Sequence, residues 1–114
     1  MGHVLLDEWG QDPGVQAMRQ AFSRMERVHD ALFDRTGVGW RDPLRARLQK
    51  MALHLFERRY GLARGRGLPE GASAMADFYA LCLARVLTLQ GYAVADNMLP
   101  ADGNLRRLFE EVAP

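Results

Sequence analysis

The chain of 114 residues offers few side chains that could hold a metal ion: His3, His29, His54 and a single cysteine, Cys82. Zinc sites usually take three or four histidine, cysteine or acidic ligands at short helix or loop spacings. No two of these four residues stand within four positions of each other, and no pair of Glu-x-x-His motifs, as used by di-iron bundles, occurs. The sequence therefore predicts no metal site and no cofactor.

Cys82 is the only thiol that could act as a nucleophile. It lies in the middle of an apolar, leucine-rich stretch, where loss of water raises the pKa of a thiol and suppresses the reactive thiolate. The serines Ser23 and Ser73 belong to no recognised nucleophile motif. We therefore expect Cys82 to be buried and unreactive, and we expect no catalytic residue.

Basic side chains gather on one face of a predicted helix. Residues 41–66 hold eight arginines or lysines against two acidic residues, a net charge of +6 in a chain whose total is +1. At 100° per residue, Arg47, His54 and Arg58 project within a narrow sector, and Lys50 flanks them. Arg45 and Arg59 instead project toward the apolar face of the same helix. The pattern predicts a solvated or partner-binding basic face.

Two residues of that face permit an enzymatic alternative. Arg47 and His54, with six residues between them, resemble the Arg-x(4–6)-His signature of HEPN-type ribonucleases. Those ribonucleases are small helical bundles that dimerise to assemble their site. The resemblance implies cleavage of RNA by Arg47 and His54.

A glycine-rich connector, residues 61–71, follows the basic helix and contains Arg64 and Arg66. Glycines and arginines before a helix can form a nest for phosphate. Glu70 already places a carboxylate in the first turn of the next predicted helix, which favours a flexible connector. Arg64 and Arg66 extend the basic surface that we expect to face an acidic partner.

Four helices would position these side chains, at about 13–35, 43–60, 70–90 and 104–113. Asp-Pro pairs at 12–13 and 42–43 predict two helix starts, and Asp102 or Asn104 would cap the last helix. Short connections favour antiparallel neighbours. The expected fold is an all-α, single-domain antiparallel bundle spanning 1–114, with residues 1–12 as an N-terminal arm.

Apolar side chains recur at spacings of three and four along these helices, as a buried helix face requires. The third helix is apolar nearly all round, which predicts that it is central. In the arm, Trp9 would pack back on the bundle, and Trp40 would plug one end. The predicted apolar faces comprise Val15, Met18, Phe22, Met25, Val28 and Leu32; Leu44, Leu48, Met51, Leu55 and Leu62; Met75, Phe78, Tyr79, Cys82, Val86 and Leu89; and Leu105, Leu108, Phe109 and Val112.

Composition places the chain among ordinary globular domains, with 48% hydrophobic and 25% charged residues. One cysteine and no recognisable signal peptide favour the cytoplasm. The longest apolar segment is broken by Arg85 and predicts no membrane span. Fourteen of the fifteen basic residues are arginine, which is common in GC-rich bacterial or phage genomes.

These observations favour a non-enzymatic helical binding module, or a small subunit of a larger assembly. Its basic helix and connector would face an acidic partner, with nucleic acid as one candidate; a protein adaptor without nucleic-acid contact is the alternative. We also expect a protein partner or a second copy, because Leu53, Leu81, Leu83 and Leu87 leave apolar surface for another chain to cover. In size, helicity and basicity the chain is similar to small helical subunits of bacterial nucleoprotein complexes, including CRISPR effectors.

Overall fold

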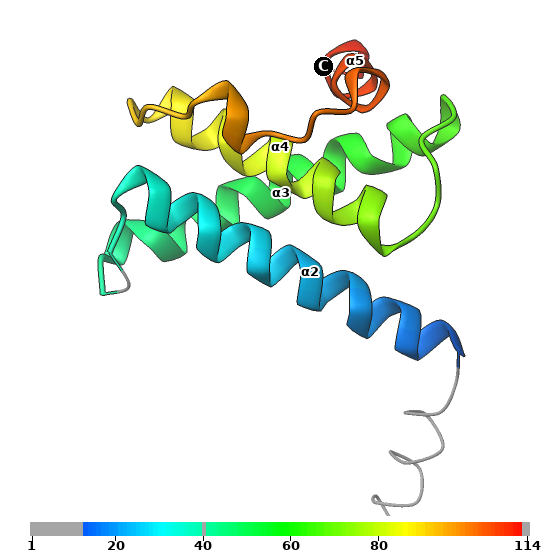
Figure 1. The fold of residues 1–114 in the computed structure, drawn as a ribbon, viewed down its shortest axis with the longest axis horizontal. Helices are drawn as coiled ribbons and strands as arrows, with labels where there is room; N and C mark the ends of the chain where they lie inside the picture. Colours follow the sequence, from blue (N-terminus) through cyan, green and yellow to red (C-terminus); the bar gives the residue numbers. More distant parts are fainter. Residues whose placement is uncertain (1–12, 40, 113–114) are drawn as a thin grey trace, which may run out of the picture.

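The structure, a computed structural model, describes residues 13–39 and 41–112, with side chains from residue 20 onward. The described residues form the α-helices α2 (Pro13–Thr36), α3 (Pro43–Gly65), α4 (Ala72–Leu89) and α5 (Gly103–Glu111), and a short 3-10 helix, η1 (Asp96–Met98). Helices α2, α3 and α4 run in alternating directions, and α5 is seen nearly end-on across them (Figure 1). The predicted all-α antiparallel bundle is confirmed.

Helix α4 is the central element, as its composition predicts. Both α2 and α3 pack along it, and α5 covers part of its remaining surface (Figure 1). Leu81, Leu83 and Leu87 are all buried, so the expectation that they leave apolar surface uncovered is wrong. The helices of this chain cover α4 without a partner, because α5 and the preceding segment pack on the side of α4 that α2 and α3 leave open.

The length and composition of α4 also match those of a membrane-crossing helix, the one such helix among the described residues. Most of it is buried inside the bundle, at positions Ala76, Phe78–Ala84, Val86 and Leu87. A core helix has this composition because every side of it meets another element. We therefore describe α4 as the core helix of the bundle.

The core has two adjoining parts on either side of α4. One joins α2, α3 and α4 around Phe33, Leu48 and Leu83, and the other joins α3, α4 and α5 around Phe78 and Phe109. Phe78 and Cys82 are fully buried and Val86 is nearly so. The prediction that these three α4 side chains are inaccessible is confirmed.

Helix α3 extends to Gly65, five residues beyond the predicted end at residue 60. Gly61 does not stop the helix, because a glycine inside a helix costs only about 1 kcal/mol, and the buried Ala63 beyond it adds packing. The turn that ends the helix is formed instead at Gly67, two residues beyond it, whose φ of 100° is left-handed. The Leu68 amide donates to the Ala63 carbonyl and the Gly67 amide to the Arg64 carbonyl, which together make a Schellman motif.

The start of α4 also differs from the prediction. It begins at Ala72, after Gly71 with a φ of 124°, so Glu70 lies before the helix and not in its first turn. At α5, the Asp102 side chain accepts hydrogen bonds from the Asn104 and Leu105 amides. Of the two predicted caps, Asp102 is the one used.

Four predicted core residues are exposed: Phe22, Met51, Leu62 and Leu89, at 58%, 38%, 59% and 73%. On α3, Met51 and Leu62 lie about 70–90° around the helix from the centre of its buried face, at 100° per residue. Spacings of three and four continue past the edge of a buried face, so periodicity alone cannot exclude them. Some predictions lie outside the residues or side chains that the structure describes. They concern the arm 1–12 with His3 and Trp9, and the side chains of Val15, Met18 and Trp40.

Candidate functional site

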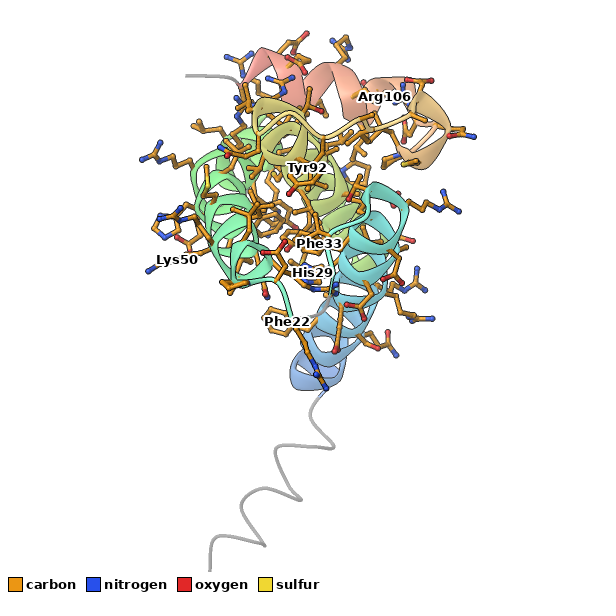
Figure 2. The ribbon with its side chains drawn as sticks, turned by 90° about the vertical axis from the view of Figure 1, so that its left-hand side faces the viewer. Phe22, His29, Phe33, Lys50, Tyr92 and Arg106 are labelled. Carbon is orange, nitrogen blue, oxygen red and sulfur yellow. The ribbon has the colours of Figure 1, made fainter. Side chains whose placement is uncertain are left out.

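The basic stripe, which we define as Arg47, Lys50, His54 and Arg58, lies on the outer face of α3. All four side chains are exposed, and Lys50 points away from the bundle (Figure 2). Among the described residues, no ion pair involves any of them. The structure thus brings four of the six predicted partner-binding residues onto one open face.

The remaining arginines of α3 that were predicted to project inward, Arg45 and Arg59, are buried. Arg45 forms an ion pair of 2.8 Å with Asp30, and its guanidinium carbon lies 4.6 Å from the centre of the Phe33 ring. Arg59 donates a 3.3 Å hydrogen bond to the backbone carbonyl of Phe109, and its guanidinium lies over the ring of the same residue. These two arginines link helices inside the fold.

The two arginines predicted to extend the basic surface, Arg64 and Arg66, have carboxylate partners. Arg64 pairs with Glu70, and Arg66 lies 3.8 Å from Glu111. At 100° per residue, Arg64 also points about 100° away from the direction of Arg47. Within α3, the exposed positive charge that has no carboxylate partner among the described residues therefore lies on the basic stripe.

Apolar side chains accompany the stripe. Met51 and Leu62, both partly exposed, project beside Arg47 and Arg58 on the same side of α3. The acidic Glu57 is also exposed beside the stripe. The surface as a whole combines four basic groups with two apolar contacts and one carboxylate.

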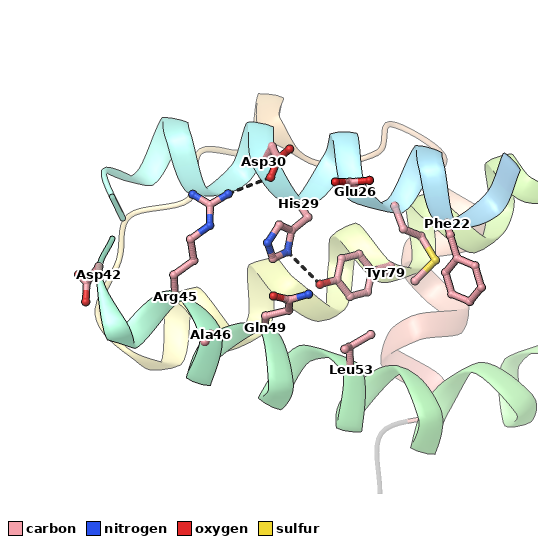
Figure 3. Close-up of a pocket in the computed structure, with 11 residues that line it drawn as sticks. Phe22, Glu26, His29, Asp30, Asp42, Arg45, Ala46, Gln49, Leu53 and Tyr79 are labelled. Carbon is pink, nitrogen blue, oxygen red and sulfur yellow. Dashed lines mark hydrogen bonds and ion pairs between the residues drawn. The ribbon is translucent and has the colours of Figure 1, made fainter. Parts of the chain in front are cut away.

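A groove of about 550 Å³ lies between α2 and α3 and was not foreseen from the sequence. Figure 3 shows His29, Asp30 and Glu26 entering it from α2, Gln49 and Leu53 from α3, and Tyr79 from α4 at its floor. His29 Nδ1 lies 3.2 Å from the Tyr79 hydroxyl, and both residues are buried. At one end of the groove is the exposed Phe22, and at the other the Arg45–Asp30 ion pair.

The groove disfavours a charged His29. Burial lowers the pKa of His29 from its ordinary 6.5, and the Arg45 guanidinium lowers it further, while Asp30 and Glu26 oppose the shift. Burial also raises the pKa of Tyr79. Both groups are therefore neutral near pH 7, and the pair forms an uncharged hydrogen-bonded floor.

The lowered pKa of His29 makes stability depend on pH. Below a pH of about 6.5 the unfolded chain binds a proton at this histidine more readily than the folded chain does. The stability that neutral His29 contributes to the folded state is therefore complete above that pH and is lost as the pH falls. We expect the free energy of unfolding to decrease from pH 7 to pH 5 and the decrease to be smaller in His29→Gln. Urea unfolding at several pH values measures it. Equal slopes for His29→Gln and the parent protein would contradict the assignment.

Cys82 is fully buried in the core and reaches neither the solvent nor the groove. Burial raises the pKa of its thiol to about 12, which Arg59 and Arg85 only partly oppose. We expect the native protein to react with a disulfide reagent such as DTNB many times more slowly than the urea-unfolded protein. Equal rates in the two states, followed by absorbance, would show that Cys82 is accessible.

Arg47 and His54, the pair that resembles the HEPN signature, share the exposed face of α3 and do not line the groove. Among residues 20–39 and 41–112, no cluster of three or more histidine, cysteine or acidic side chains could hold a metal ion. No protein-family model, curated protein or solved structure matches the chain.

Proposed function

We propose that this protein is a non-enzymatic binding module whose basic stripe contacts a negatively charged partner, with a nucleic-acid backbone as the first candidate. The observation that carries the proposal is the way in which the basic residues of α3 and of the segment after it divide between internal contacts and the open surface. Arg45 and Arg59 link helices in the interior, and Arg64 and Arg66 have carboxylate partners. The basic stripe serves no such structural contact among the described residues, so its charge is available to a partner.

The spacing of the stripe supports the same proposal. Arg47 with Lys50, Lys50 with His54, and His54 with Arg58 are neighbours three or four positions apart, where like charges destabilise a helix by roughly 0.2–0.5 kcal/mol per pair. His54 adds to this only when it is protonated. An anionic partner would relieve the repulsion, and a row of phosphates is the anion that such a row of cations matches most simply.

A panel of labelled polyanions tests the proposal. Fluorescence anisotropy at low salt should show binding to single-stranded RNA, single-stranded DNA or duplex DNA of unrelated sequence, since backbone contacts carry no sequence information. Poly-L-glutamate serves as the protein-like anion of the panel. Binding to poly-L-glutamate alone would support the adaptor alternative, and binding to none of these polymers would contradict a polyanion-binding stripe.

The same samples test the ribonuclease alternative. It rests on Arg47 and His54 sharing one exposed face. If the RNA is cleaved by the parent protein and intact with His54→Ala, the chain is an enzyme and the non-enzymatic proposal is wrong. Intact RNA after prolonged incubation supports binding without chemistry.

A further inference from the structure

The groove between α2 and α3 holds more negative than positive charge. Glu26, Asp30 and Asp42 line it against a single guanidinium, that of Arg45, and His29 is neutral. Two of the carboxylates already have structural roles: Asp30 pairs with Arg45, and Asp42 accepts the Leu44 amide at the start of α3. Glu26 is exposed and takes part in no ion pair among the described residues. It is the carboxylate available to a ligand.

Apolar side chains lie next to Glu26. Phe22 precedes it by one helical turn, so the two side chains lie on the same side of α2, and both line the groove with Met25 and Leu53 (Figure 3). Phe22 is 58% exposed, and an aromatic ring gains stability when a ligand covers it. A positive charge beside Phe22 would also meet the negative face of the ring.

The floor of the groove supplies neutral polar groups. The His29–Tyr79 pair lies below, and the Gln49 amide projects from α3 toward it (Figure 3). A groove of about 550 Å³ lies within the size range of small-molecule sites, and its lining combines apolar side chains with several polar and charged groups. The excess of carboxylates disfavours an anion there.

We propose that this groove binds a small organic cation, an ammonium group on an aromatic or branched aliphatic body. The ammonium lies against Glu26, and the body covers Phe22, Met25 and Leu53. The site does not share residues with the basic stripe: at 100° per residue, Gln49 and Leu53 project about 145° and 105° away from the centre of the stripe. The proposal is therefore independent of polyanion binding.

Three matched probes test the site: phenethylamine, the neutral 2-phenylethanol and the anionic 3-phenylpropionate. Titrations followed by NMR chemical shifts should show saturable millimolar or tighter binding of the amine, with perturbed signals at Phe22 and Tyr79. The alcohol and the acid should bind at least about fivefold more weakly, as expected for the loss of roughly 1 kcal/mol from a partly exposed ion pair. No saturable binding of the amine, or equal binding of all three probes, would overturn the proposal.

Two variants locate the site. Glu26→Gln should weaken amine binding about fivefold and leave binding of 2-phenylethanol unchanged, and Phe22→Ser should weaken binding of both. Both positions are exposed, so the variants should fold as the parent does. The matched control is Glu57→Gln, an exposed carboxylate of α3 that does not line the groove, which should bind the amine as the parent does. If Glu26→Gln and Glu57→Gln have the same affinity for the amine, the proposed site is wrong.

Discussion

Replacing Phe78 by alanine is expected to lower the free energy of unfolding by about 3–5 kcal/mol. Phe78 is fully buried in the middle of α4. Its ring centre lies 6.0 Å from that of Phe56, 5.7 Å from that of Tyr60 and 5.5 Å from that of Phe109. The substitution removes contacts to α3 and α5 together, and the cavity cannot close without moving both helices.

Urea unfolding followed by circular dichroism measures this loss, with Phe22→Ala as the matched control. Phe22 is the same residue type but is exposed, so its removal should change stability by less than about 0.5 kcal/mol. Because a small domain has only about 5–15 kcal/mol in total, Phe78→Ala could be largely unfolded; Phe78→Leu should then show a smaller loss of stability. Equal stability of Phe78→Ala and the parent would contradict the central position of α4.

Reversing Arg47, Lys50 and Arg58 together to glutamate is expected to abolish binding to the polyanion that the parent protein recognises. The affinity should fall at least about a hundredfold, since roughly 1 kcal/mol for each lost cation already amounts to this factor. The melting temperature should stay nearly unchanged because all three side chains are exposed and take part in no ion pair among the described residues. Anisotropy and thermal unfolding, measured on the same sample, separate the two effects.

The control for that variant changes the net charge equally but elsewhere. Arg24, Arg27 and Arg35 are exposed on α2, and their reversal adds the same negative charge away from the basic stripe. This control should lose only the part of the affinity that is due to overall charge. If both triple variants lose binding to the same extent, the stripe has no special role.

The sequence predicts the helices well because their signals are local. Asp42 before Pro43 marks the start of α3, and the nearly uninterrupted apolar character of α4 identifies the buried centre of the bundle. The inward direction of Arg45 and Arg59 likewise follows from helix geometry. Each of these predictions needs only the 3.6-residue period and the side-chain types.

Other features depend on how helices pack and could not be predicted in the same way. The exposure of Phe22 and the groove beside it depend on the separation of α2 and α3, which no single-helix pattern encodes. Several glycines could end α3, and the burial of Ala63 and Leu68 determines which of them does. Both residues pack against distant parts of the chain. The ion pairs of Arg64 and Arg66 likewise depend on how the chain folds and not on a local pattern.

The salt dependence of polyanion binding tests the central claim most directly. Cations that neutralise phosphates release counterions, so the logarithm of the association constant should fall linearly with the logarithm of the salt concentration. With Arg47, Lys50 and Arg58 as the permanent charges, we predict a slope of about −2 for a single strand and about −3 for a duplex. A parent protein that binds no nucleic acid at low salt, or binds it with a slope near zero, would contradict the proposal that the basic stripe faces a phosphate backbone.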